Sequence, residues 1–307
     1  MHRDGLLSRG TGAVGACPDL RLSLKTLPLQ QPTPLSPALA ALAGLISVQT
    51  GAAIGKSLFP LVGSDGVAAL RLGMSAIILC LLLRPWTIWP RARRRDLLVY
   101  GVVMGMMNLL IYRAFASIPV SIAVAIEVLG PLGAALVASR RAIDILWVSL
   151  SLAGLVLLPL GALHGGLDWH GIAFALGAAL CWGLYIFAGA RVAQHGSQAV
   201  ATGMLVAALF AVPIGAFQAG SLLLAPHILA IGLGVAILSS MLPYLLDMFA
   251  MRHLPANVFG VLLSASPAVS ALAACVILGE ALSPLQCLGI AFISCACAGS
   301  TLSRKSG

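Results

Sequence analysis

Long, uninterrupted apolar runs recur along most of this chain, and short polar segments separate them. A helix needs about 20 apolar residues to cross a bilayer, and each run has roughly that length. No water in the hydrocarbon region can satisfy free backbone groups, so each run is predicted to be helical. The predicted spans are 37–58, 66–83, 96–115, 118–138, 143–163, 171–190, 198–217, 227–248, 256–278 and 284–302.

Composition agrees with this pattern. The chain has 307 residues, of which 60% are hydrophobic and only 9% are charged, whereas a soluble domain carries about 25% charged residues. The runs are apolar throughout and do not alternate with polar residues, which excludes a transmembrane β-barrel. The predicted fold class is an all-α polytopic membrane protein with ten transmembrane helices. Such a protein has the lipid bilayer as a partner.

The net charge of +9 would suggest a nucleic-acid partner in a soluble protein. Here all but three of the 18 Lys and Arg residues fall on one side of the ten predicted spans. Positive residues collect in cytoplasmic loops, so both termini are placed in the cytoplasm. The basic run at 91–95 is then a topology anchor, and no nucleic-acid partner is expected. The three exceptions are Lys56, Arg71 and Arg113.

Residues 1–36 differ from the rest of the chain because they are mixed polar and contain several prolines. No apolar run follows the early arginines in the manner of a cleaved signal peptide. We expect a flexible cytoplasmic tail, with an over-long start of the reading frame as the alternative.

An internal repeat follows from the prolines of two segments, "SIPVSIAVAIEVLGP" and "HLPANVFGVLLSASP". Pro119 and Pro131 have the same separation as Pro255 and Pro267. The chain is therefore predicted to hold two five-helix units, 37–163 and 171–302. Because five is odd, the second unit enters the membrane from the opposite side. Inverted repeats of this kind are typical of secondary transporters that work by alternating access.

Several long segments carry a family resemblance. They are "GKSLFPLVG" with "ALRLG", "YGVVMGMMN", "IAVAIEVLGPLGAALVASRR", "VAILSSMLPYLLDM" and "LGEALSPLQ". In this order they resemble the bacterial inner-membrane threonine/homoserine exporters, which belong to the drug/metabolite transporter superfamily and have two EamA-type repeats. The resemblance implies ten helices, efflux of small neutral amino acids and proton coupling. Where the family pattern has an acidic residue before the proline of span nine, this chain has Ser266.

Two other functions stay open at this point. One is an exporter of other metabolites or drugs within the same superfamily, for which Ser266 leaves room. The other is a membrane-embedded enzyme, but the chain has no HExxH motif, and its histidines all map to the tail, to loops or to span ends. We expect no enzyme activity, no cofactor and no metal site, and we leave a homodimer open.

The charges inside the spans are the main candidates for substrate binding or coupling. A charge at the bilayer centre costs roughly 2.5–3.5 kcal/mol, so Glu127 in span four is expected to face the protein interior. An amino acid carries one carboxylate and one ammonium group, and Arg71 or Lys56 together with Glu127 would bind both. Alternatively, Glu127 forms a structural ion pair with one of these cations, or Lys56 extends to the interface.

Polar and aromatic residues of the spans complete the candidates. Packing between helices or at the membrane interface is the alternative for most of them, and Arg113 is expected to cap the outer end of span three. Prolines that break spans four, eight and nine are hinge candidates, with a structural kink as the alternative. The remaining binding or coupling candidates are Asn108, Tyr112, Trp182, Tyr185, Tyr244, Asp247 and Ser266, and the hinge candidates are Pro131, Pro243 and Pro267.

Overall fold

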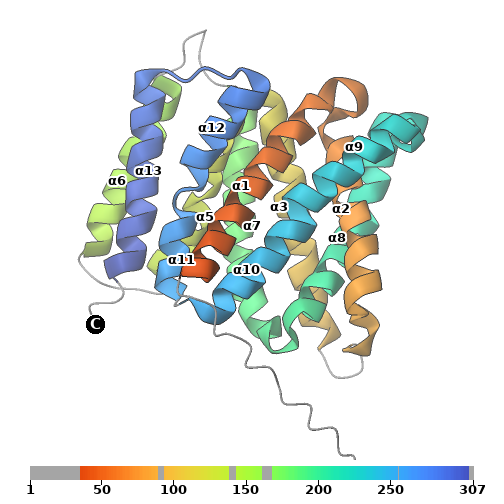
Figure 1. Cartoon of the computed structure of the whole chain (residues 1–307). Helices are drawn as coiled ribbons and strands as arrows, with labels where there is room; N and C mark the ends of the chain where they lie inside the picture. Colours follow the sequence, from red (N-terminus) through yellow and green to blue (C-terminus); the bar gives the residue numbers. More distant parts are fainter. Residues whose placement is uncertain (1–34, 89–92, 138–142, 161–167, 255, 304–307) are drawn as a thin grey trace, which may run out of the picture. The chain divides into compact units, whose positions relative to one another are not determined.

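The computed structural model describes residues 35–88, 93–137, 143–160, 168–254 and 256–303. These residues form helices joined by short turns, without a strand among them, and belong to the compact unit Thr33–Gly307 (Figure 1). The predicted tail lies outside the described residues except for its last two positions. Pro255, which belongs to the proposed repeat, also lies outside them.

The helices follow the predicted spans closely. Their bounds are α1 (Leu35–Ser57), α2 (Phe59–Leu83), η1 (Pro85–Thr87), α3 (Arg94–Ser117), α4 (Val120–Glu127), α5 (Leu129–Val137), α6 (Ile143–Leu160), α7 (Trp169–Val192), η2 (Ala193–His195), α8 (Gly196–Ala219), η3 (Gly220–Leu224), α9 (Pro226–Ala236), η4 (Ile237–Met241), α10 (Leu242–His253), α11 (Ala256–Leu263), α12 (Ser266–Leu278) and α13 (Pro284–Ser303).

In the part of the chain that the structure describes, seven helical stretches are long and apolar enough to cross a membrane. One of them, Trp169–Leu224, includes both α7 and α8, and two further apolar helices, Val120–Ala134 and Ile145–Leu160, are shorter. The chain is therefore a multi-pass membrane protein. The count of ten spans stays a prediction.

The helices change character just before the prolines of three predicted spans. Span four divides into α4 and α5 ahead of Pro131, and span nine divides into α11 and α12 ahead of Pro267. Span eight stays helical throughout, from α9 through η4, a short π-helix, into α10, whose second residue is Pro243. Proline is tolerated in the first turn of a helix because the N–H that it lacks has no intrahelical partner there. Spans four and nine are thus divided as predicted, and the role of the three prolines as hinges stays a prediction.

A further break, which the sequence pattern did not predict, lies near the start of α2. Gly63 has φ of 72°, a conformation that residues with a Cβ rarely adopt. The amide groups after this break lack helical acceptors, and the side-chain oxygen of Gln218 in α8 accepts from the backbone N–H of Asp65 (2.9 Å) and of Gly66 (3.3 Å). Gln218 therefore caps the straight part of α2.

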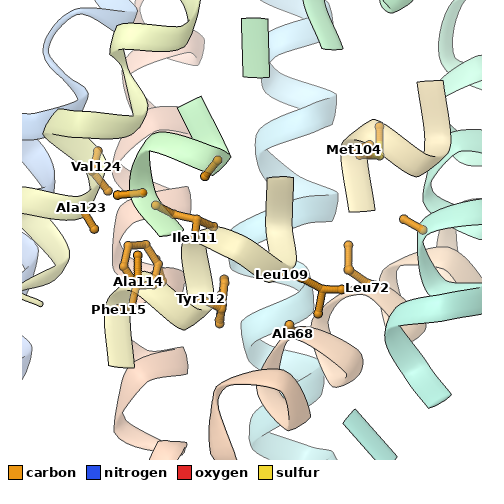
Figure 2. Close-up of a cluster of buried hydrophobic side chains, with 14 of the residues drawn as sticks. Ala68, Leu72, Met104, Leu109, Ile111, Tyr112, Ala114, Phe115, Ala123 and Val124 are labelled. Atoms are coloured by element: carbon orange, nitrogen blue, oxygen red, sulfur yellow. The ribbon is translucent and has the colours of Figure 1, made fainter. Parts of the chain in front are cut away.

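The buried core includes residues of α2, α3 and α4. Figure 2 shows Leu72 of α2, Met104 and Phe115 of α3 and Val124 of α4 within this cluster, and all four side chains are buried. Beyond the core, α2 packs against α8, α3 packs against α7, and α6 packs beside α13 (Figure 1). Each of these contacts buries the apolar face of one helix against another and leaves the remaining face for lipid.

Helix α7 begins at a polar cap. The side chain of Asp168 accepts a hydrogen bond from the backbone N–H of His170 (2.9 Å), and its Oδ1 lies 3.1 Å from Nδ1 of the His170 ring. These contacts, first of all the backbone hydrogen bond, lower the pKa of Asp168 below its ordinary value. An acidic side chain at a helix N-terminus is also favoured by the helix dipole.

Candidate functional site

Arg71 occupies the interior side of α2 and is held by three groups. Its Nε donates to Oγ of Ser240 (3.0 Å), and its Nη2 donates to the backbone oxygen of Ser239 (2.9 Å). The guanidinium lies over the ring of Tyr112, 5.4 Å from the ring centroid, in a cation–π contact. No hydrogen bond joins the remaining nitrogen, Nη1, to another described residue. Arg71 is therefore fixed in place with one donor group left for a ligand.

The partner of Arg71 is the π-helix η4, whose backbone differs from an α-helix. A π-helical turn shifts the hydrogen-bond ladder and leaves carbonyl groups for other donors, and such turns recur at functional sites. Ser47 donates to the carbonyl oxygen of Leu238 (2.6 Å), and Ser75 donates to that of Ala236 (3.3 Å). Close approach of α1 to η4 depends on Gly51, because a Cβ there would lie 2.8 Å from the backbone nitrogen of Ser239.

Glu127 is the last residue of α4, at the break that precedes α5. It is partly buried and takes part in none of the ion pairs that the described residues form. Arg71 nonetheless lies near enough to act on it electrostatically. The alternative that Glu127 is neutralised in an ion pair with Arg71 or Lys56 is therefore wrong. Arg71 and Glu127 lie on different helices and form no ion pair with each other.

Tyr244, Tyr185 and Asp247 lie in the same polar interior. Tyr244 is within electrostatic range of Arg71, Tyr185 and Asp247. Oδ1 of Asp247 is buried without a hydrogen-bond partner in the described chain, and a Cβ on Gly44, in the middle of α1, would lie 3.0 Å from it. Asp247 thus packs against α1, and its role at the substrate site or as an interfacial charge stays a prediction.

Lys56 has a different partner from the one expected. Its Nζ donates to Oε1 of Glu280 (2.8 Å) and to the backbone oxygen of Ile118 (3.3 Å). Glu280 also accepts from the backbone N–H of Val120, at 3.0 Å to Oε2 and 3.3 Å to Oε1. Lys56 therefore neither extends freely to the interface nor pairs with Glu127, which leaves Arg71 as the cation beside Glu127.

Arg113 also has an unpredicted partner. Its Nε and Nη2 donate to Oδ1 and Oδ2 of Asp65, both at 2.8 Å. The prediction that Arg113 caps the end of its own helix is wrong, because the guanidinium joins α3 to α2 instead. With Gln218, this pair lines an open depression of about 740 Å³, whose other walls are the apolar side chains of Pro213, Ile214 and Phe217 on α8.

The remaining candidates contact neighbouring helices or their own backbone, and their part in substrate binding stays a prediction. Asn108 is buried and donates to the backbone oxygen of Met104 one turn earlier (2.8 Å). Trp182 packs on Gly130 of α5, and Tyr185 stacks on Tyr100, with their hydroxyl oxygens 2.9 Å apart. Ser266 is buried at the start of α12.

Five polar residues of these clusters were not predicted from the sequence. One signal was available, since Lys56 and Arg113 were cations that the charge rule left unexplained. Asp65 and Glu280 are acidic residues near span ends of the same predicted side, and matching them with the leftover cations would have found both pairs. The unpredicted residues are Asp65, Gln218, Ser239, Ser240 and Glu280. Among the described residues, no cluster of His, Cys, Asp and Glu could hold a metal ion.

Comparison with known proteins identifies the relatives of this chain. The model of the EamA-like transporter family matches residues 169–302. The threonine/homoserine exporter RhtA of Escherichia coli strain K12 is 47% identical over 272 residues, which cover 88% of this chain and 92% of that protein. The RhtA exporter of Salmonella typhimurium strain LT2 matches to the same extent.

This chain belongs to the RhtA family. The relatives named as RhtA are exporters and the EamA family is one of transporters, so the chain is a transporter and not an enzyme. One crystal structure of a protein 22% identical to this chain supports the fold, with a TM-score of 0.59 over 88% of this chain and 97% of its own. The predicted resemblance to the exporter family is confirmed.

Proposed function

We propose that this chain exports small neutral amino acids of the threonine and homoserine type across the inner membrane. The observation that carries this proposal is its 47% identity, over nearly the whole length, to RhtA proteins named for these two substrates. Both are zwitterions at neutral pH, so a binding site for them needs a cation and an anion close together.

Arg71 and Glu127 are the groups that we assign to the two ends of the zwitterion. A guanidinium binds a carboxylate through strong charge-assisted hydrogen bonds, and Nη1 of Arg71 is not used by another described residue. Glu127 would bind the substrate ammonium or carry a proton. The assignment is supported by the lack of an ion pair at either side chain among the described residues and by the unused nitrogen of Arg71.

Transport by alternating access of two inverted repeats, 37–163 and 171–302, is the mechanism that we propose. Inverted repeats are related by a two-fold axis, under which α1 exchanges with α7, α3 with α10, and α5 with α12. The contacts support this relation: α1 packs against α10 and α12, while α7 packs against α3 and α5. The proposal includes ten spans, which rest on the lengths of the apolar runs. It also places both termini in the cytoplasm, which rests on the charge distribution.

Export of other metabolites or drugs is the second candidate. It is favoured by Ser266, which stands where the family pattern has an acidic residue. If that acid helps select the substrate in relatives, its absence next to Pro267 would change which molecules this chain accepts.

The test is efflux of labelled threonine or homoserine from loaded cells that lack their own exporters, with and without a protonophore. Accelerated efflux that collapses with the proton gradient is the expected result. Faster efflux that ignores the protonophore would keep the substrate and overturn proton coupling. No acceleration, with the protein shown to be in the membrane, would overturn the substrate and favour the second candidate.

A further inference from the structure

Glu280 joins three segments that are distant in sequence. Its carboxylate binds Lys56 at the last turn of α1 and the backbone N–H of Val120 at the first turn of α4, while Glu280 itself follows α12. Lys56 adds a hydrogen bond to the carbonyl oxygen of Ile118, just before α4. Two of the three segments belong to the first proposed repeat and one to the second, so the cluster connects the repeats.

The cluster lies directly beside the site assigned to the substrate. Lys56 follows Gly55, where a Cβ would lie 3.2 Å from the hydroxyl oxygen of Tyr112, and the Tyr112 ring carries the guanidinium of Arg71. Along α4, Val120 precedes Glu127 by two helical turns, which is about 10 Å at 1.5 Å per residue. Lys56 and Glu280 thus bridge the end of α1 and the start of α4, the helix whose last residue is Glu127.

The contact also has properties suited to repeated breaking. The side chains of Lys56 and Glu280 are 23% and 14% exposed, so water can reach both groups when they separate. Solvent screens part of the attraction between the two charges, so separating them costs less than separating a fully buried pair. Glu280 sits in the non-helical segment after Gly279, which ends α12 with φ of 68°, so its movement requires no helix to unwind.

We infer that Lys56 and Glu280 form a gate of the transport pathway, whose contact with the start of α4 closes one end of the substrate site and breaks once in each transport cycle. This inference rests on the proposed function in one respect, because it places the substrate beside Arg71. In the described conformation the gate is closed. Lys56 is therefore a gating residue and not the cation that binds substrate.

The gate is tested by the access of a thiol reagent to the interior. Ser240 contacts Arg71 and is fully buried in this conformation, so a Ser240→Cys variant, made in a chain without its native cysteines, reports opening. A membrane-impermeant maleimide is applied to right-side-out and to inside-out vesicles. Glu280→Gln and Lys56→Met each remove the pair, and each is expected to raise the labelling rate severalfold from one side only.

The matched control is Asp65→Asn, which weakens the other interhelical ion pair without touching the gate and is expected to leave labelling unchanged. Thermal unfolding of each purified variant shows which of them fold, and Lys56→Met decides the outcome if Glu280→Gln does not fold. Labelling of the folded gate variants at the rate of the control, from both sides, would overturn the gate. This readout requires no exported substrate, so a failed threonine assay and a failed gate give different results.

Discussion

Charges at the ends of the helices differ from charges in the interior of the bundle. Asp65 and Arg113 form a bidentate pair, and Lys56 binds Glu280, so each of these charges has an opposite charge within 2.8 Å. In the interior, Arg71 is held by Ser239, Ser240 and Tyr112, all of which are uncharged, while Glu127 takes part in no ion pair of the described chain.

The comparison indicates how charges that hold helices together differ from charges that bind a ligand in a membrane protein. A charge in the hydrocarbon region is costly and needs a reason to be there. A charge that already has its ionic partner holds two segments in contact, either throughout or, as proposed for Lys56 and Glu280, in one conformation of the transport cycle. A charge that is positioned by neutral groups can still bind an oppositely charged group of a ligand. A zwitterionic substrate carries two charged groups and can therefore bind two such residues.

The largest effect is expected at Glu127. Glu127→Gln keeps the shape of the side chain but removes the charge that would bind the ammonium group. Hydrogen bonds to charged groups contribute about 1.5–3 kcal/mol, so substrate efflux is expected to fall about tenfold or more. The measurement is the initial efflux rate of labelled threonine, normalised to the amount of folded protein. An unchanged rate would mean that Glu127 does not belong with the functional charges.

Arg71 is expected to affect both transport and stability. Arg71→Ala removes the proposed carboxylate ligand and also leaves the carbonyl oxygen of Ser239 without its donor. Efflux should fall severalfold, and the melting temperature should fall as well, since a buried polar group left unsatisfied costs about 1–3 kcal/mol. Arg71→Lys keeps the charge without the planar guanidinium and is expected to recover stability only in part. Full transport by Arg71→Ala would contradict the assignment.

Arg113 is the matched test among the paired charges. Arg113→Ala leaves Asp65, only 10% exposed, without its partner, so the protein should be destabilised. The expected loss is about 1 kcal/mol, because the Arg113 side chain is 38% exposed and solvent screens the pair. Thermal unfolding measures this loss, and efflux per folded molecule should remain at the wild-type level. A selective loss of efflux at unchanged stability would place this pair in the transport pathway.

The smallest effect is expected at Asp168. Its pKa is lowered by hydrogen bonds in the folded state, so its contribution is present above the unfolded pKa and is lost as the pH falls through the folded pKa. The melting temperature of Asp168→Ala should therefore lie slightly below that of the wild type at neutral pH, and the two should converge in acid. A constant difference across this range would show that the capping charge contributes nothing.

Much of the fold was predictable because the bilayer restricts what a long apolar run can form. The helix bounds and the divisions of spans four and nine before Pro131 and Pro267 followed from hydropathy and from the missing proline N–H. The break at Gly63 did not, because a glycine in an apolar run is compatible with either a helix or a break. The break is stabilised by Gln218 of α8, which is distant from Gly63 in the sequence.

The site was predictable in its residue types but not in its pairings. Arg71 and Glu127 were found because each is a charge where lipid-facing residues would be expected. The partner of Lys56 was missed because Glu280 lies in a turn, where an acidic residue needs no special explanation. Ser239 and Ser240 were missed because serine is compatible with both membrane helices and π-helices, and the carbonyl groups freed in η4 leave no mark in the sequence.

The most direct test of the division between paired and unpaired charges compares Glu127→Gln with Arg113→Ala in one threonine-efflux assay, at equal amounts of folded protein. We expect Glu127→Gln to lose efflux while keeping its thermal stability, and Arg113→Ala to keep efflux while losing stability. Wild-type efflux by Glu127→Gln, or loss of efflux by a folded Arg113→Ala protein, would contradict this division.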